Sequence, residues 1–303
     1  MTRRYWPMIL TLAFLWGASY LLIKVGVDGG LSPASLMSAR ALIAGIVLMG
    51  YLTATMGFSR AVAEIRTAWF ACIVLGVLNA AVPFWLVAWG ETHIDSGIAS
   101  IAQATVPLFS LLIGLRFLPH ERVGTTRIVG IGVGLVGAVL VAGMASGDKA
   151  TATIGVLAVV LASFFYASGA IFSELRLRGT TSGSVLATGS LLAAGCMLLP
   201  FGIAQHPVEM PTAGAAGSLL LLAVFGTALA NLILFHVIAL HGARRLSLVT
   251  YLMPGIALVY GAILLGERIS AAELTGLALI LLGVALGSGT LRLRTGKPAA
   301  QAP

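Results

Sequence analysis

Ten apolar stretches of about 20 residues follow one another along this chain of 303 residues, and they constrain its fold more than any other feature. At 1.5 Å per helical residue, each stretch is long enough to cross the ~30 Å hydrocarbon core of a bilayer. We therefore predict an all-α membrane protein of ten transmembrane helices. Their expected limits are 7–26, 34–55, 67–91, 95–116, 125–144, 153–173, 184–204, 214–239, 245–265 and 271–291.

The composition supports this interpretation. Hydrophobic residues make up 59% of the chain and charged residues 9%, against roughly 25% charged residues in a soluble domain. The connections are too short to hold an inserted soluble domain. Arg3 and Arg4 before the first apolar stretch imitate a signal peptide, but no small-residue cleavage site follows. We expect an uncleaved first helix, with the lipid bilayer as a partner.

Basic residues predict the orientation, because Lys and Arg concentrate in cytoplasmic loops. With the N-terminus in the cytoplasm, 14 of the 18 Lys and Arg residues lie on the cytoplasmic side. The four on the other side are Lys24, Arg40, Lys149 and Arg268. We predict a multi-pass protein of the cytoplasmic (inner) membrane with both termini in the cytoplasm. The net charge of +8 is thereby explained, and no nucleic-acid partner is expected.

A Glu-Arg pair occurs twice in polar turns between long apolar stretches. Glu121 lies between the fourth and fifth stretches, and Glu267 lies between the ninth and tenth. The prolines before them, Pro107 and Pro254, are also about 147 residues apart. The chain is therefore interpreted as two copies of one five-helix unit, in residues 1–149 and 150–291, with a cytoplasmic tail over 292–303.

An odd number of helices in each unit inverts the second unit in the membrane relative to the first. Many secondary transporters place a substrate site between such inverted repeats. Glu121 is then expected to face the cytoplasm, and Glu267 the outside. Ser270 followed by Glu273 predicts a capping box at the start of the last helix.

Several motifs in this order resemble the EamA family of the drug/metabolite transporter superfamily. They are "LWGASYLLIK" at 15–24, Pro33 followed by Arg40, "TVPLFSLL" running on to "ERVG", and "LMPGIALVYGAILLGER". Within that family the likeness is to YddG-type amino acid exporters. The resemblance implies an exporter of small metabolites in which helices 3, 4 and 9 surround a central cavity.

Three prolines lie inside apolar stretches, each four residues after a polar side chain. A helical proline frees the carbonyl of residue i−4, so Pro83, Pro107 and Pro254 free those of Asn79, Gln103 and Thr250. Such groups need a neighbouring helix or a water-filled cavity. Both alternatives stay open for these three hinge or kink candidates, although the resemblance favours the cavity.

A zwitterionic substrate needs hydrogen-bond donors and acceptors at both of its poles, and amide side chains supply both kinds. Aromatic residues facing inward would contact its side chain, whereas facing outward they would contact lipid or the core. The predicted substrate-binding residues are Trp16, Ser19, Tyr20, Asn79, Gln103, Tyr166, Asn231 and Tyr251.

Five charged or titratable residues fall near the ends of apolar stretches. Lys24 and Arg40 have two interpretations: snorkelling toward the interface, or contact with a substrate carboxylate. Glu91 and Glu174 are expected to be solvated. His236, about a turn from the cytoplasmic end, is a further charge contact, although a lone histidine is more often structural than a proton relay.

Several functions lack their motifs. The chain has no GxxxxGK[ST] loop for ATP hydrolysis and no His/Cys/Asp cluster for a metal, so no metal, cofactor or enzymatic activity is expected. The stretch "MILTLAFLWG" contains no Asp or Glu, so it lacks the membrane-embedded acidic side chain that would exchange cations for protons. Ser19 with His236 leaves an intramembrane hydrolase as a weak alternative.

The function predicted from the sequence is export of small zwitterionic metabolites, amino acids first among them, by alternating access. A passive channel or facilitator and a scaffold are further alternatives. Paired glycines, Gly130 with Gly134 and Gly283 with Gly287, permit close helix approach. We expect that approach within one chain, so a monomer is favoured over a dimer.

Overall fold

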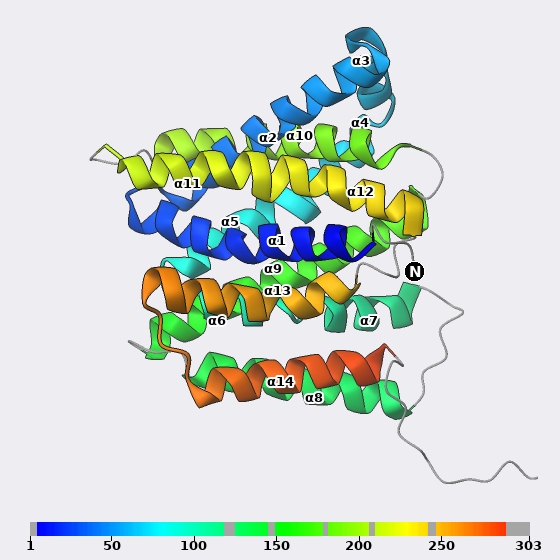
Figure 1. Ribbon diagram of the computed structural model, residues 1–303. Helices are drawn as coiled ribbons and strands as arrows, with labels where there is room; N and C mark the ends of the chain where they lie inside the picture. Colours follow the sequence, from blue (N-terminus) through cyan, green and yellow to red (C-terminus); the bar gives the residue numbers. More distant parts are fainter. Residues whose placement is uncertain are drawn as a thin grey trace, which may run out of the picture.

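The computed structural model describes residues 5–117, 125–144, 149–177, 181–205, 210–241 and 247–288. Over these ranges all regular secondary structure is helical. The helices run side by side along one direction and form an elongated bundle (Figure 1). Below, the end of the bundle at which α1 begins is called the N-terminal end, and the opposite end is called the distal end.

Most predicted stretches form one helix, and four of them are divided. In the first half the helices are α1 (Tyr5–Asp28), α2 (Pro33–Met56), α3 (Phe58–Thr67), α4 (Trp69–Gly76), the π-helix η1 (Val77–Ala81), α5 (Val82–Glu91), α6 (Ser96–Gln103), α7 (Val106–Phe117) and α8 (Thr125–Met144). In the second half they are α9 (Lys149–Arg176), α10 (Gly183–Ala204), α11 (Ala213–Ala223), the π-helix η2 (Val224–Leu229), α12 (Ala230–His241), α13 (Ser247–Tyr260), the π-helix η4 (Gly261–Leu265) and α14 (Ala271–Gly287).

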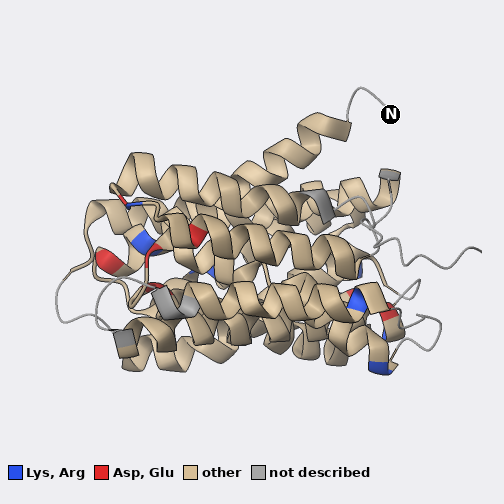
Figure 2. Cartoon of the chain, turned by 90° about the horizontal axis from the view of Figure 1, so that it is seen from below, with Lys and Arg blue, Asp and Glu red and all other residues tan. Residues whose placement is uncertain are grey.

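The apolar helices confirm a multi-pass membrane protein of the all-α class. Within the described residues, seven continuous helical segments are long and apolar enough to span a bilayer. The other three predicted stretches contain shorter apolar helices, at Thr125–Val141, Val249–Leu265 and Ala271–Gly287. Charged residues lie mostly toward the two ends of the bundle, and the middle of the described part holds few of them (Figure 2).

One helix was not predicted. α3 follows Gly57, whose φ of +85° is a left-handed value that glycine adopts at little cost, and the chain turns there out of α2. The helix stands away from the bundle (Figure 1). Its ten residues include several polar ones on one face, so the sequence predicted a connection between two spans rather than a helix.

Two helix pairs form the long contacts of the bundle, α2 with α10 and α8 with α14. In the second pair the backbones meet at the predicted glycines. A Cβ atom built on Gly130 would lie 2.5 Å from the Gly287 nitrogen and 2.6 Å from the Gly283 oxygen. The expected close approach within the chain is therefore confirmed. Between these pairs, α1 packs on α13 and α11, while α9 packs on α7 and α5.

The start of α14 has the predicted capping box. The Ser270 hydroxyl accepts from the Glu273 nitrogen over 3.2 Å, and the Glu273 carboxylate accepts from the Ser270 nitrogen over 3.4 Å. These two bonds satisfy backbone donors that a helix terminus otherwise leaves open. They fix the point at which the chain turns from η4 into the last helix. The matching turn at Glu121 lies outside the described residues.

Candidate functional site

A buried cation lies inside the bundle on α2. Arg40 is 7% exposed, and its Nε donates to Thr227 Oγ1 on η2 over 2.8 Å. Its Nη1 lies 3.6 Å from Met37 Sδ, and its guanidinium carbon lies 4.0 Å from the centre of the Phe84 ring. The described residues pair it with no carboxylate. Since an unpaired buried charge is costly, an anionic ligand group would be stabilised here.

Two predicted residues lie near this cation, and a third lies beside one of them. Tyr20 and Tyr166 lie close enough to Arg40 to interact with its charge, and Tyr166 lies beside the Gln103 side chain. Gln103 Oε1 is buried and lacks a hydrogen-bond partner among the described residues. Buried polar atoms are nearly always paired, so this acceptor is available for a donor that the chain does not supply.

The other two predicted amides pack within the protein. Asn231 Nδ2 donates to the Thr227 carbonyl over 2.8 Å, so Thr227 contacts both Asn231 and Arg40. Asn79 packs against Gly169 of α9, where an added Cβ would collide with the amide. Asn231 is thus linked to the cation through Thr227, whereas Arg40 has no carboxylate partner and Gln103 Oε1 has no donor among the described residues.

Two π-helices interrupt the helices that carry these amides. η1 begins at Val77 and η2 begins at Val224, which matches the 147-residue offset between Pro107 and Pro254. Single-turn π segments recur at functional sites because they break the regular hydrogen-bond ladder. The sequence reading missed both. Pro83 just after η1 was a usable signal, whereas η2 holds no proline.

The three predicted hinge prolines differ. Pro83 is the second residue of α5, which follows η1, and Pro107 is the second residue of α7, just after the break that follows the end of α6 at Gln103. Pro254 lies inside α13, which continues past it. Ser163 Oγ on α9 approaches the Gln103 carbonyl to 3.5 Å, so a neighbouring helix faces at least this freed acceptor.

Three more predicted binding residues pack in the interior. Trp16 is half-buried between two apolar clusters, and Tyr251 packs half-buried against the larger one. Ser19 is buried and donates to the Leu15 carbonyl over 3.0 Å. None of the three lines the cavity of the described part of the chain.

A cavity of about 510 Å³ opens at the N-terminal end. Its walls come from α1, α2, α10 and α12, at Met8, Tyr51, Ser184, Leu232, Ile233, Phe235 and His236. Among the predicted site residues described here, His236 alone lines it. The cavity lining includes Leu232, the residue after Asn231, but neither Asn231 nor Arg40.

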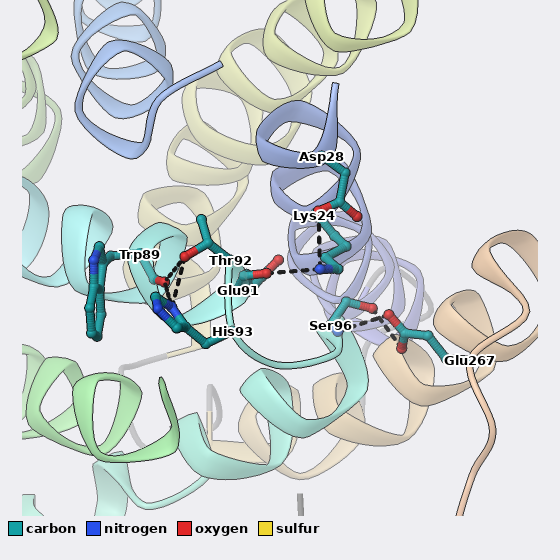
Figure 3. Close-up of polar contacts among 8 residues, drawn as sticks. All are labelled: Lys24, Asp28, Trp89, Glu91, Thr92, His93, Ser96 and Glu267. Atoms are coloured by element: carbon teal, nitrogen blue, oxygen red, sulfur yellow. Dashed lines mark hydrogen bonds and ion pairs between the residues drawn. The ribbon is translucent and has the colours of Figure 1, made fainter. Parts of the chain in front are cut away.

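The distal end is closed by a contact that joins the two halves of the chain (Figure 3). The Glu267 carboxylate accepts from the Ser96 nitrogen over 2.8 Å, from Ser96 Oγ over 3.0 Å and from the Gly97 nitrogen over 3.0 Å. A carboxylate is favoured at a helix N-terminus, where free N–H groups and the helix dipole both attract it. We call this contact the Glu267 latch.

Glycines leave room for the latch. An added Cβ on Gly261 would collide with the Glu267 carboxylate, and one on Gly97 would lie 3.4 Å from Oε2. Gly266, with φ of +70°, turns the chain just before Glu267. The Glu-Arg pair was interpreted as a plain polar turn, so the role of Glu267 was missed. The adjacent helix start at Asp95–Gly97 gave a signal, because its N–H groups need acceptors.

A second group of charges lies beside the latch (Figure 3). Lys24 Nζ donates to Asp28 Oδ1 over 3.1 Å and to the Glu91 backbone carbonyl over 3.0 Å. Lys24 therefore ties α1 to the end of α5. Asp95, between two helices, has a raised pKa, mainly through burial and then through the nearby Glu267 charge.

One of the two interpretations of Arg40 is excluded, and one prediction about a carboxylate was wrong. Arg40 does not snorkel, because its guanidinium turns inward to Thr227 and the Phe84 ring. Glu91 is not solvated: it is 0% exposed, and α9, α1 and α6 all pack on α5. Glu174, in contrast, is exposed as expected. Position along a span did not reveal which face of the helix points into the bundle.

Comparison with known proteins supplies a family. The model of the EamA-like transporter family matches residues 5–143 and 153–289. The chain is 27% identical to the uncharacterized inner membrane transporter YedA of Escherichia coli strain K12, over 92% of this chain and 88% of the relative. It is 28% identical to a probable terminal-alkyne amino-acid exporter of Streptantibioticus cattleyicolor, over 94% and 93%.

A solved structure shares the fold. It superposes with a TM-score of 0.67 at 20% sequence identity and covers 94% of this chain and 97% of that one. At this identity the likeness concerns the path of the backbone. It extends over nearly the whole of both chains, so the bundle is shared as a unit.

Proposed function

The chain belongs to the EamA-like transporter family, and from this premise we propose that it exports small zwitterionic metabolites, amino acids first among them, by alternating access. That it is a membrane transporter follows from the family and from the names of its relatives. The substrate class and the mechanism are the proposal. We also propose that it lies in the inner membrane, with both termini in the cytoplasm.

The observation that carries the substrate class is the pairing of unused polar groups around Tyr166. Arg40 offers a guanidinium without a carboxylate partner, and Gln103 Oε1 is an acceptor without a donor. A carboxylate on the first and an ammonium group on the second would satisfy both. Arginine matches carboxylates well, because its N–H groups form a planar fork. An α-amino acid carries both of these groups on neighbouring atoms.

One relative supports the same substrate class. The Streptantibioticus cattleyicolor protein that matches over 94% of this chain is named as a probable exporter of a terminal-alkyne amino acid. Such a substrate shares its zwitterionic part with all amino acids. We therefore assign recognition of that part to Arg40 and Gln103, and contact with the variable side chain to Tyr20 and Tyr166.

Alternating access is supported by the unlike ends of the bundle and by the paired interruptions η1 and η2. The Glu267 latch closes one end, while a cavity opens at the other. α2 packs on α10 and α8 packs on α14, and each pair joins a helix to its counterpart in the proposed inverted repeats. Residues 1–149 and 150–291 would then exchange roles as the two ends open in turn.

The test uses the purified chain in liposomes with radiolabelled neutral amino acids. Losing a hydrogen bond to a charged group costs about 1.5–3 kcal/mol, or roughly 10- to 150-fold in affinity. Arg40→Gln and Gln103→Leu should each raise the half-saturating concentration by at least about tenfold. Arg60→Gln is the matched control, since Arg60 is exposed and pairs with Glu64 on α3.

Two outcomes would sink the proposal. If Arg40→Gln and Gln103→Leu both transport like the Arg60→Gln control, the substrate does not bind at these groups. If unlabelled substrate loaded inside the liposomes fails to speed the uptake of labelled substrate by the parent chain, the protein is a passive channel, because trans-acceleration requires a carrier that returns loaded. Folded yield in detergent shows whether a variant has merely lost its structure.

A further inference from the structure

Glu91, the last residue of α5, carries a carboxyl group with no role in the proposed substrate site. It is 0% exposed, and both Oε1 and Oε2 lack a hydrogen-bond partner among the described residues. An ionised carboxylate buried in this way pays a large desolvation penalty with nothing to offset it, and such a group takes up a proton instead. In the closed distal end, the Glu91 carboxyl is therefore neutral.

The charged groups around Glu91 do not neutralise it. Lys24 on α1 contacts the Glu91 backbone carbonyl and Asp28, and not the carboxylate. Glu267 already brings a negative charge held by the start of α6. The further neighbours are Asp28 and Tyr20 on α1, Arg40 on α2, and His93 and Asp95 in the turn after α5. Residues 150–173 of α9, which also packs on α5, carry no charge.

We propose that Glu91 is a proton-binding site that controls the distal end: the protonated carboxyl permits closure, and opening releases its proton to water on the distal side. The O–H bond of the carboxyl breaks, and a water molecule of the opened end takes the proton. Closure reverses this step. The proposal rests on the proposed function only in requiring that the distal end can open.

Electrostatics give the direction of this coupling. In the closed state two cations act on Glu91: Lys24, which is paired with Asp28, and Arg40, which is bonded to Thr227. The carboxylates of Asp28 and Glu267 oppose them. Ionising Glu91 would add a further negative charge beside Glu267 and repel the latch. Asp95 reports the same environment, because its pKa is raised by burial and by the nearby Glu267. Acid on the distal side should therefore hold that end closed, and alkali should favour opening.

The first test reads the proton directly and needs no substrate. Infrared difference spectra of the purified chain, recorded as the pH is raised, should show loss of a protonated-carboxyl band. That band should be missing in Glu91→Gln, whose amide keeps the size of the neutral carboxyl, and present in the control Glu174→Gln, since Glu174 is exposed. If Glu91→Gln retains the whole band, Glu91 is not protonated and the proposal fails.

The second test reads the opening of the distal end. In a chain with Cys72→Ala and Cys196→Ala, a reporter at Ser100→Cys lies on α6 at a position that is 0% exposed. Its labelling by a soluble thiol reagent is divided by that of the exposed Ala213→Cys, which corrects for the reactivity of the thiol itself. One linked proton limits the change in this ratio to about tenfold per pH unit.

The expected result is a corrected labelling ratio that rises with pH in the parent and in Glu174→Gln, but stays low and flat in Glu91→Gln. A ratio that rises equally in Glu91→Gln would overturn the proposal. Substrate transport enters neither test. If these tests fail, the proposed substrate site at Arg40 and Gln103 is unaffected. If the transport test of that site fails, the proposed role of Glu91 is unaffected.

Discussion

The two ends of the bundle differ in what their helices do with free polar groups. At the distal end, the N–H groups at the start of α6 bind the Glu267 carboxylate, and Lys24 ties α1 to α5. At the N-terminal end, largely apolar side chains of α1, α2 and α12 border a cavity of about 510 Å³. One end is therefore closed by polar contacts between the two halves, while the other is open.

This difference shows which contacts would have to break during transport. The latch joins Glu267 of the second half to Ser96 and Gly97 of the first half, so it is lost if the halves separate at that end. The glycine contacts between α8 and α14 involve neither the latch residues nor the residues that line the cavity, so they can persist. The latch is therefore expected to set the balance between the two states.

The largest expected effect comes from removing the latch. Glu267→Ala deletes three hydrogen bonds to a carboxylate, but water then solvates the freed donors. A net cost of about 1.5–3 kcal/mol would shift the ratio of open to closed distal ends roughly 10- to 150-fold. Labelling of the buried reporter Ser100→Cys should rise accordingly.

Ser270→Ala is the control for that variant. It removes a hydrogen bond from the nearby capping box of α14 and leaves the latch intact. It should lower the melting temperature slightly, since an N-cap contributes about 0.5–2 kcal/mol, without raising the labelling of Ser100→Cys. Equal labelling of Ser100→Cys in both variants would mean that the latch only caps a helix and does not control the opening of the distal end.

A smaller effect is expected at Asp95, the N-cap of α6. Its pKa is raised from the ordinary value of 3.8. Between the ordinary pKa of the unfolded state and the raised pKa of the folded state, the folded state binds more protons. Stability is then fully present below the ordinary pKa and is lost as the pH rises through the raised one. Asp95→Asn should thus raise the melting temperature modestly at pH 7, with no gain in strong acid. A lower melting temperature at pH 7 would contradict this sign.

The fold was predictable from local pattern. Apolar stretches long enough to span a bilayer gave helices within a few residues of their observed limits, because each must satisfy its own backbone in lipid. The capping box at Ser270 and the glycine contact at Gly130 were predictable for the same reason, since each depends on short spacing. The helix α3 was not, because ten residues of mixed polarity resemble a loop.

The site was only partly predictable. Tyr20, Gln103 and Tyr166 were predicted from residue type and depth. Tyr20 and Tyr166 lie near Arg40, and Gln103 lies beside Tyr166. The burial of Arg40 and Glu91 could not be derived, since it depends on how each helix is rotated against its neighbours. The partners of Glu267 lie about 170 residues away in the sequence, and no local pattern specifies such a contact.

The most direct test of alternating access is a paired labelling measurement in detergent, where a soluble thiol reagent reaches both ends. One reporter is Ser100→Cys at the distal end, and the other is Ile233→Cys in the wall of the N-terminal cavity. In the parent background, Ile233→Cys should label fast and Ser100→Cys slowly. With Glu267→Ala added, the distal rate should rise while the cavity rate falls. A distal rate that rises while the cavity rate stays high would show both ends open together, as in a channel, and would contradict the account.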